Sequence, residues 1–298
     1  MPVPLSQTYG KEVPQYPPYA NQTFRLEITR IIPIWPKRVY LQWLLRKPSL
    51  ATGYVFNIFR SGSSEGPWEH IGEDLDDTYF FIDDSFDANY SNRSPDLMSL
   101  NRAVYYKVTV SGGLPAGTDS AEATKKMEAG LSQRHRGIHR KLQRDARIVL
   151  KKVIGTEVAI LKRKWWGTPC TTCVNSTGQS SRAHCSVCYG TGIVDGYWAP
   201  VYGYAQRQRG VSPIMTQTQE AGKVDIHRIE VIMLNIPEVE HMDILAFIRD
   251  GNRYVVESVI PTQIHTVHVH QELQVSELAR TASEYKIVVD PWHEPEWF

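Results

Sequence analysis

Four cysteines constrain this chain more than any other feature of its 298 residues. They form two close pairs with the spacing Cys170-x2-Cys173-x11-Cys185-x2-Cys188. Each Cys-x2-Cys unit places two sulfur atoms on one tight turn, and two such turns can complete a tetrahedron around a single ion. We therefore expect all four cysteines to hold one structural Zn²⁺ per chain.

Glycines beside the cysteines favour the same interpretation. Gly167 precedes the first pair, and Gly190 and Gly192 follow the second. Glycine after such a turn lets backbone N–H groups point toward the sulfur atoms. Four protein ligands leave no coordination position for water or substrate, so the expected zinc is structural and not catalytic. Two disulfides, free buried thiols, or His184 in place of one cysteine are the alternatives.

The beginning of the chain predicts neither export nor a membrane anchor. It has no charged segment followed by an apolar core, so we expect no secretory signal. No run of 18 apolar residues predicts a membrane span. Paired cysteines without an export signal favour metal binding in a reducing cytoplasm. Residues 1–22 contain five prolines and predict an extended arm.

Residues 23–112 show the alternation of apolar and polar side chains that is typical of strands. Such runs occur at residues 23–34, 39–43, 54–58, 80–82 and 104–110. Turn-forming residues separate them, as at 61–67. Short alternating strands with turns between them predict a β-sandwich of about 90 residues.

The strand pattern of this region resembles the fibronectin type III family. The resemblance rests on residues 39–43, 54–61, 68–71, 81–84 and 104–110. In that family a tryptophan lies early in the core, and a tyrosine of the next-to-last strand hydrogen-bonds back at a corner. Trp43 and Tyr106 match those positions. The resemblance implies an adhesive or spacing module without catalytic chemistry.

A strongly basic segment follows. Residues 119–153 lack proline and predict one helix, or two that meet near Gly130 or Gly137. Between Lys125 and Lys164, thirteen Lys or Arg residues stand against three acids, an excess of +10, so the rest of the chain sums to −9. The basic face is either a solvated surface or a surface on which DNA or an acidic partner docks.

Cations and tryptophans also stand directly before the first cysteine pair. Such residues can stack on bases and hold phosphates, or the tryptophans can simply cover a small lobe that has little core of its own. The candidate contacts to DNA or a partner are Arg140, Lys141, Arg144, Arg147, Lys151, Lys152, Arg163, Lys164, Trp165 and Trp166.

The C-terminal part predicts a small β-barrel. Strand patterns occur at residues 224–234, 243–248, 253–259, 264–270 and 285–289, with a hairpin turn at Asp250-Gly251-Asn252 and a short helix near 276–280. The expected fold class is therefore multidomain and mainly β. Its parts are an arm (1–22), the fibronectin-like sandwich (23–112), a linker with the basic helical segment (113–164), the zinc-knuckle lobe (165–204), the barrel (205–290) and an exposed aromatic tail (291–298).

Two further resemblances concern function. The unit Cys185-x2-Cys188-x-Gly190-x-Gly192 resembles the zinc region of J-protein chaperones. That family has four such repeats and this chain has two pairs, without a J-domain signature, so the resemblance implies a shared knuckle geometry and not a shared function.

Residues 251–259, 271–278 and 285–289 are similar to the barrel of tailed-phage head–tail connector proteins of the stopper or adaptor type. This resemblance implies a virion neck protein, assembled in the host cytoplasm as a homo-oligomeric ring around packaged double-stranded DNA, with portal or adaptor and tail proteins as partners. The alternatives are a nucleic-acid-binding zinc-ribbon protein and another tail or baseplate structural protein. No P-loop or His-Glu-x-x-His motif occurs, and we expect no enzyme and no membrane partner.

Overall fold

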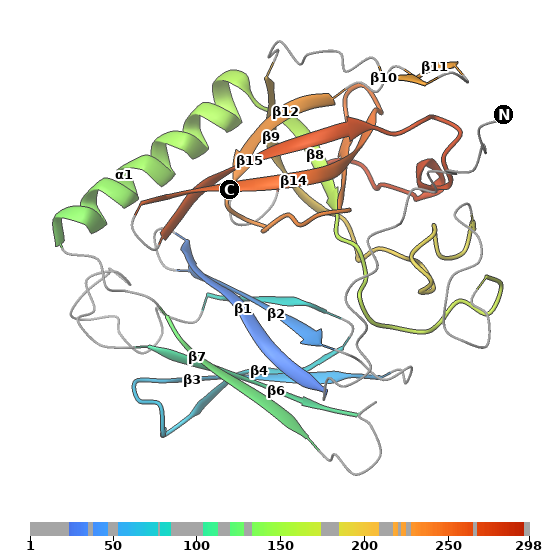
Figure 1. Ribbon diagram of the computed structural model, residues 1–298. Coiled ribbons are helices and arrows are strands. Elements are labelled where there is room, and N and C mark those ends of the chain that lie inside the picture. The colour runs from blue at the N-terminus through green and yellow to red at the C-terminus, as the bar shows by residue number, and fades with distance from the viewer. Residues whose placement is uncertain are drawn as a thin grey trace, which may run out of the picture.

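A β-sandwich and a closed β-barrel make up the body of the protein, in a computed structural model, with one long helix against the barrel (Figure 1). The structure describes residues 24–34, 38–46, 53–76, 78–84, 104–112, 120–127, 133–173, 185–208, 217–219, 222–224, 228–264 and 267–294. The predicted mainly β class is confirmed. The arm at 1–22 lies outside the described residues. Within them, no helix has the length and hydrophobicity to cross a membrane.

Two antiparallel sheets form the sandwich. The first has the order β1-β2-β5, with β1 at Arg25–Ile34, β2 at Arg38–Arg46 and β5 at Phe80–Asp83. The second has the order β4-β3-β6-β7, with β4 at Glu69–Asp76, β3 at Val55–Ser61, β6 at Tyr105–Ser111 and β7 at Ala121–Lys126. Apolar residues at every second position of β3 and β6 bury one face of each strand. Trp43 of β2 meets Phe56 of β3 in the core, with ring centroids 5.2 Å apart.

The sandwich extends further along the chain than the sequence predicted. Residues 121–126 were expected to begin the helical segment, but they form β7, which pairs with β6 from Tyr105 to Val110. Met127 then closes the core with 2% of its surface exposed. Alanine, glutamate and lysine are good helix formers, but helix propensity differs by less than about 1 kcal/mol per residue, and pairing with an open sheet edge outweighs it.

The barrel closes in the order β12-β15-β14-β13-β8-β9. Its strands are β8 (Thr156–Leu161), β9 (Val201–Gln208), β12 (Arg228–Leu234), β13 (Ile244–Phe247), β14 (Arg253–Ile264) and β15 (Val267–Glu277). The predicted boundary at 205 is therefore wrong, because β8 and the start of β9 belong to the barrel. Residues 162–200, which contain the four cysteines, are an insertion between two neighbouring barrel strands.

The C-terminal segment also differs from the prediction. A 3₁₀ helix, η4 (Ser283–Lys286), stands where a strand was expected at 285–289, and residues 276–277 end β15 where a short helix was expected. The tail was expected to be exposed. Trp292 instead packs on Tyr202 and Tyr204 of β9, with ring centroids 5.7 and 5.0 Å apart, because these rings offer an apolar surface outside the barrel.

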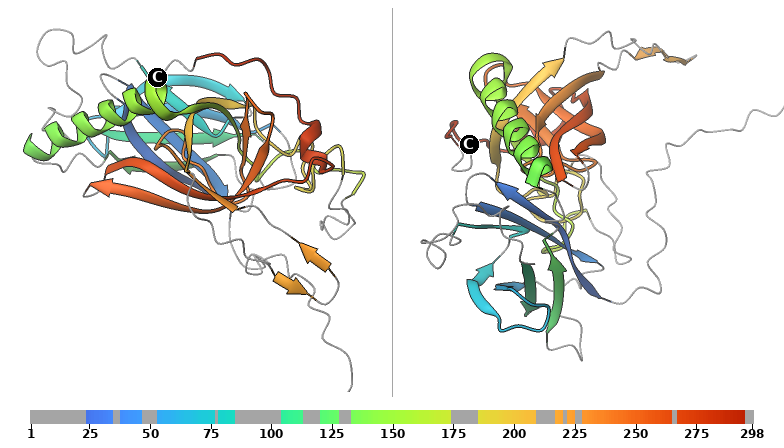
Figure 2. Two further views of the ribbon diagram at one scale, coloured as in Figure 1. Left: turned by 90° about the horizontal axis from the view of Figure 1, so that it is seen from above. Right: turned by 90° about the vertical axis from the view of Figure 1, so that its left-hand side faces the viewer.

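The helical segment is one helix, α1 (Gln133–Val149), followed by a π-helical turn, η3 (Leu150–Ile154). It is shorter than predicted, and Gly137 lies within it. Gly155 then turns the chain into β8, and a Cβ atom there would meet the Leu150 carbonyl oxygen at 2.0 Å. Helix α1 lies against β12 and β15 on the outside of the barrel (Figure 1). The short strands β10 (Gln217–Gln219) and β11 (Gly222–Val224) project from the body between β9 and β12 (Figure 2).

The sheet β1-β2-β5 is covered on both faces. One face packs on the second sheet of the sandwich, and the other faces the barrel (Figure 2). Ile32, Ile34 and Tyr40 pack there against Ile236, which follows β12. This sheet therefore joins the two modules through apolar contact at Ile236.

Charged side chains reinforce the same joint. The guanidinium of Arg30 lies 2.7 Å from the carboxylate of Glu238. Lys162, only 3% exposed, donates a hydrogen bond to the Glu238 carbonyl oxygen at 2.8 Å and lies 3.3 Å from the carboxylate of Asp243. Burial would lower the pKa of Lys162, but the neighbouring carboxylates outweigh burial and raise it, so the ammonium stays charged.

Candidate metal centre

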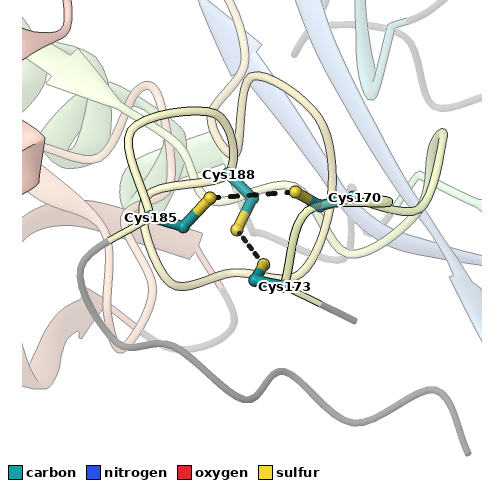
Figure 3. Close-up of side chains that lie close together, drawn as sticks. All are labelled: Cys170, Cys173, Cys185 and Cys188. Atoms are coloured by element: carbon teal, nitrogen blue, oxygen red, sulfur yellow. Dashed lines mark hydrogen bonds between the residues drawn. The ribbon is translucent and has the colours of Figure 1, made fainter. Parts of the chain in front are cut away.

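The four cysteine side chains converge on one point in the inserted lobe (Figure 3). Their sulfur atoms all lie within 4.8 Å of one another and are buried. The Sγ atoms of Cys170 and Cys185 are 3.8 Å apart, and those of Cys173 and Cys188 are 3.0 Å apart. A tetrahedron with Zn–S bonds of about 2.3 Å separates its sulfur atoms by about 3.8 Å.

These distances fit a metal cluster and do not fit a pair of disulfides. A disulfide requires about 2.05 Å between sulfur atoms, and all four cysteines are free. The close pairs also lie across the two knuckles and not within them. The predicted grouping of the four cysteines is confirmed, and the cluster can hold one metal ion. His184 lies outside the described residues.

Tight backbone turns build the second knuckle. The N–H of Tyr189 donates to the Cys185 carbonyl at 2.8 Å, and the N–H of Thr191 donates to the Cys188 carbonyl at 2.9 Å. Gly190 and Gly192 adopt the left-handed region, with φ of 78° and 82°. Only glycine enters this region without strain, which explains why the knuckle is followed by these residues.

Backbone N–H groups also affect the pKa of two of the thiols, those of Cys185 and Cys188. Hydrogen bonds from the N–H groups of Cys188 and Val187 lower the pKa of Cys185 to about 6. Burial raises the pKa of Cys188, while the N–H groups of Gly192 and Gly190 oppose that rise. The glycine N–H groups thus reach the sulfur, as the sequence predicted. Hydrogen bonds to a thiolate stabilise the form that binds metal.

The lobe is fastened to the sandwich by two tryptophans. Trp166 and Trp198 are 3% and 5% exposed, and their ring centroids lie 5.1 Å apart. Trp198 continues to Tyr79 of the sandwich, with ring centroids 5.6 Å apart. Both tryptophans belong to the sandwich core, so the lobe connects the barrel to the sandwich. Trp166 was expected either to stack on bases or to cover the lobe; it instead packs into the sandwich core and is too buried to stack on bases.

The other residues before the first knuckle are also engaged. The guanidinium of Arg163 lies over the Trp165 ring, 5.2 Å from its centre, and the Lys164 ammonium lies over the Trp198 ring at 5.0 Å. Trp165 is partly buried against the sandwich core. These cations therefore stack on the protein's own rings.

The basic residues of the helix form a separate group. Figure 1 shows α1 and the cysteine lobe on opposite sides of the barrel. Lys141, Arg144 and Lys152 are exposed. Arg147 is half-buried, and burial lowers its pKa. Lys151 pairs with Glu294 of the tail. Arg140 lies in α1, but its side chain is outside the described part. The predicted contacts therefore divide into two groups.

A short motif at residues 62–66 matches a hydrolase pattern but does not adopt the hydrolase geometry. Residues 62–66 are Gly-Ser-Ser-Glu-Gly, which matches the Gly-x-Ser-x-Gly pattern of hydrolases. This match was not identified from the sequence. In hydrolases this pattern forms a sharp turn from a strand into a helix. Here it forms an exposed turn between the antiparallel strands β3 and β4. The serine therefore lacks the setting that activates such a nucleophile.

Sequence reasoning did not find the buried ion group of Lys162, Glu240 and Asp243. Lys162 directly follows β8, whereas Glu240 and Asp243 lie in the loop before β13, and the pairing of these two strands brings them together. No spacing along the chain could have indicated this group.

No protein-family model matches this sequence, and no curated protein is significantly similar to it. The residues themselves therefore carry the assignment of function.

Proposed function

We propose that this chain is a structural protein of a tailed-phage virion, a neck or head–tail connector subunit that assembles as a ring between portal and tail around the DNA channel. The closed barrel with α1 on its outer wall carries this proposal. A closed barrel has no free strand edge, so contacts with neighbours must come from elements added outside it. The helix, the β10–β11 projection and the sandwich are such additions.

We propose that the sandwich is a fibronectin type III-like spacing module. Its three strands packed against four support this, as do the two positions that carry the resemblance. Trp43 is 1% exposed in the core. Tyr106 lies in the next-to-last strand of the sandwich, and its hydroxyl donates to the Asp83 carboxylate at 2.8 Å.

We propose that the ion of the cysteine cluster is Zn²⁺. Four thiolates in a tetrahedral arrangement suit zinc or an iron–sulfur centre, and the glycine knuckles favour zinc. With all four positions taken by sulfur, the ion would hold the lobe together and perform no chemistry on a substrate. The lobe would then give the joint between barrel and sandwich its rigidity.

The neck assignment predicts the result of deleting the coding sequence from the phage that encodes it. We expect particles whose heads fail to keep their tails or their packaged DNA, and normal particles when the gene is supplied in trans. A labelled chain should lie between head and tail in electron micrographs. Tailed, infectious particles without the chain would contradict the proposal, and a label at the tail tip would favour the baseplate alternative.

Nucleic-acid binding is the second candidate, favoured by the exposed cations Lys141, Arg144 and Lys152. The full chain must be tested, because β7 and β8 on either side of α1 belong to the sandwich and the barrel. Binding to duplex DNA should weaken steeply with salt, and the double variant K141E/K152E should reduce the slope of log K against log salt by about 2. No binding at low salt would eliminate this function.

A further inference from the structure

The outer face of α1 and η3 is unusually apolar for a surface. Among the described residues, ten large apolar side chains are classed as exposed, and six of these lie between 138 and 154. They are Ile138, Leu142, Ile148, Val149, Val153 and Ile154. Val153 exposes 72% of its surface. Single exposed apolar residues are ordinary, but a contiguous group on one element marks an interaction site.

Helical spacing places most of these residues in one stripe. Ile138, Leu142, Val149 and Val153 are separated by four, seven and four positions, so they share one side of the helix. Gln143 and Leu150 lie about a quarter turn around the helix from this stripe and are 5% and 3% exposed. The helix therefore packs on the body through these buried residues, while no residue in the described part of the chain buries the apolar stripe beside them.

Cations border this stripe. Lys141, Arg144 and Lys152 are exposed beside it, and Asp145, the one acid within α1 and η3, pairs with Arg144 at 3.3 Å. Phosphate groups of DNA would satisfy the cations but leave the apolar side chains facing water. An apolar centre with a charged rim is the pattern of protein–protein contacts. The surface therefore suits a protein with acidic and apolar groups.

The same chain carries such a surface on β4. Residues 133–154 contain eight Lys or Arg and one Asp, an excess of +7, so the rest of the +1 chain sums to −6. Glu73, Asp74 and Asp76 are exposed on β4, around the partly buried Ile71 and Leu75. Strand β4 is the edge of the sandwich sheet that faces away from the barrel, whereas α1 lies on the barrel (Figure 1).

We propose that the α1–η3 face of one copy docks on the β4 edge of a second copy, an inference that rests on the proposed assembly function and names its subunit contact. Each copy would use two different surfaces, so the contact is head-to-tail. Such contacts generate closed rings when the rotation between copies closes, and open filaments otherwise. Opposite charges would guide the approach, and the apolar stripe would be buried at the centre.

Exposed valines provide a matched pair of variants. Val153 on η3 and Val288 near the C-terminus are 72% and 80% exposed, so replacing either by serine removes no buried contact within one chain. Both V153S and V288S should melt at the wild-type temperature. In sedimentation equilibrium, V153S should associate about tenfold more weakly, a change of about 1.4 kcal/mol, while V288S should match the wild type. Equal association of all three proteins would overturn the proposal.

Reversed charges test the partner surface. K141E/K152E makes the helix face acidic, and E73K/D76K makes the β4 edge basic. Each variant alone should sediment as a folded monomer, and an equimolar mixture should regain the wild-type assembly because each acidic face then meets a basic one. K126E on exposed Lys126 of β7 is the charge control and should assemble normally.

Three outcomes would overturn this contact: a wild-type chain that stays monomeric at every concentration, a mixture that stays monomeric, or K141E/K152E that assembles normally and loses only DNA binding. The last would assign the face to nucleic acid. A monomeric chain that is nevertheless found in the virion neck would leave the proposed function standing and remove only this contact.

Discussion

Replacing Cys188 by serine is expected to unfold the lobe between β8 and β9 and to release its metal. Among the described residues, the buried cluster at the centre of the lobe consists of the four cysteines, so the ion and the backbone turns around it would provide much of the lobe's stability. Structural zinc contributes about 10–16 kcal/mol to the folding of zinc-finger peptides, and a three-ligand site retains only part of this. We expect C188S to lose several kcal/mol in urea unfolding.

The loss should spread beyond the lobe. Trp166 and Trp198 belong to the sandwich core, so an unfolded lobe would withdraw two large side chains from it. The variant should therefore show red-shifted tryptophan fluorescence and a lower melting temperature of the whole protein. Elemental analysis should give about one zinc per wild-type chain and a small fraction of that for C188S.

Ser186 provides the control within the same knuckle. It is exposed and is no ligand, so S186A should keep the metal and the wild-type melting temperature. Prolonged treatment with a strong chelator should reproduce the effect of C188S in the wild type. Unchanged melting after chelation would show that no metal stabilises the lobe, and iron in place of zinc would refute the identity of the ion but not the site.

The cysteine site could be predicted from the sequence because its pattern involves residues that are close together along the chain. Two residues between cysteines fix the geometry of each turn, and Gly190 and Gly192 fix the backbone that follows. The alternating strands of the sandwich were readable for the same reason, since a period of two along a strand reflects burial on one face. Trp43 and Tyr106 lie in the core as their pattern predicted.

The first and last residues of the barrel could not be predicted from the sequence, because the barrel closes through pairing between segments that are distant along the chain. Strand β8 pairs with β9 across the cysteine lobe and with β13 more than eighty positions away along the chain. In sequence, β8 has the pattern of a strand, with Val158 and Ile160 on one face, but nothing nearby along the chain assigns this strand to the barrel. The predicted helical segment was too long, because residues 121–126 have a helical composition but form the last strand of a sheet. These residues form a strand because they pair with the open edge of β6.

The buried ion pair between Lys162 and Asp243 provides the second large expected effect. Asp243 is fully buried, and its carboxylate accepts hydrogen bonds from the N–H groups of Arg163 at 2.9 Å and Glu240 at 2.7 Å. K162M would leave this carboxylate in the interior without a counter-charge. Breaking a buried pair in this way costs about 3–5 kcal/mol, so we expect a loss of that size in urea unfolding.

An exposed pair gives the matched control. Arg46 and Glu27 lie 3.1 Å apart with side chains 49% and 39% exposed, and surface pairs contribute at most about 1 kcal/mol. R46M should therefore unfold within that margin of the wild type. The double variant K162M/D243N removes both charges and should recover part of the loss, which a double-mutant cycle would quantify as coupling.

The pH dependence of K162M follows from the same carboxyl group. Burial raises the pKa of Asp243, and Lys162 opposes that rise in the wild type. Without the lysine the folded-state pKa rises further, so the folded protein binds a proton more tightly than the unfolded chain, whose aspartate has a pKa of about 3.9. Stability from this group is then gained as pH falls through the raised pKa. The deficit of K162M against the wild type should therefore shrink between neutral and mildly acidic pH. A K162M variant as stable as R46M at neutral pH, or one whose deficit grows in acid, would contradict the assignment of a buried, charged pair at the joint between sandwich and barrel.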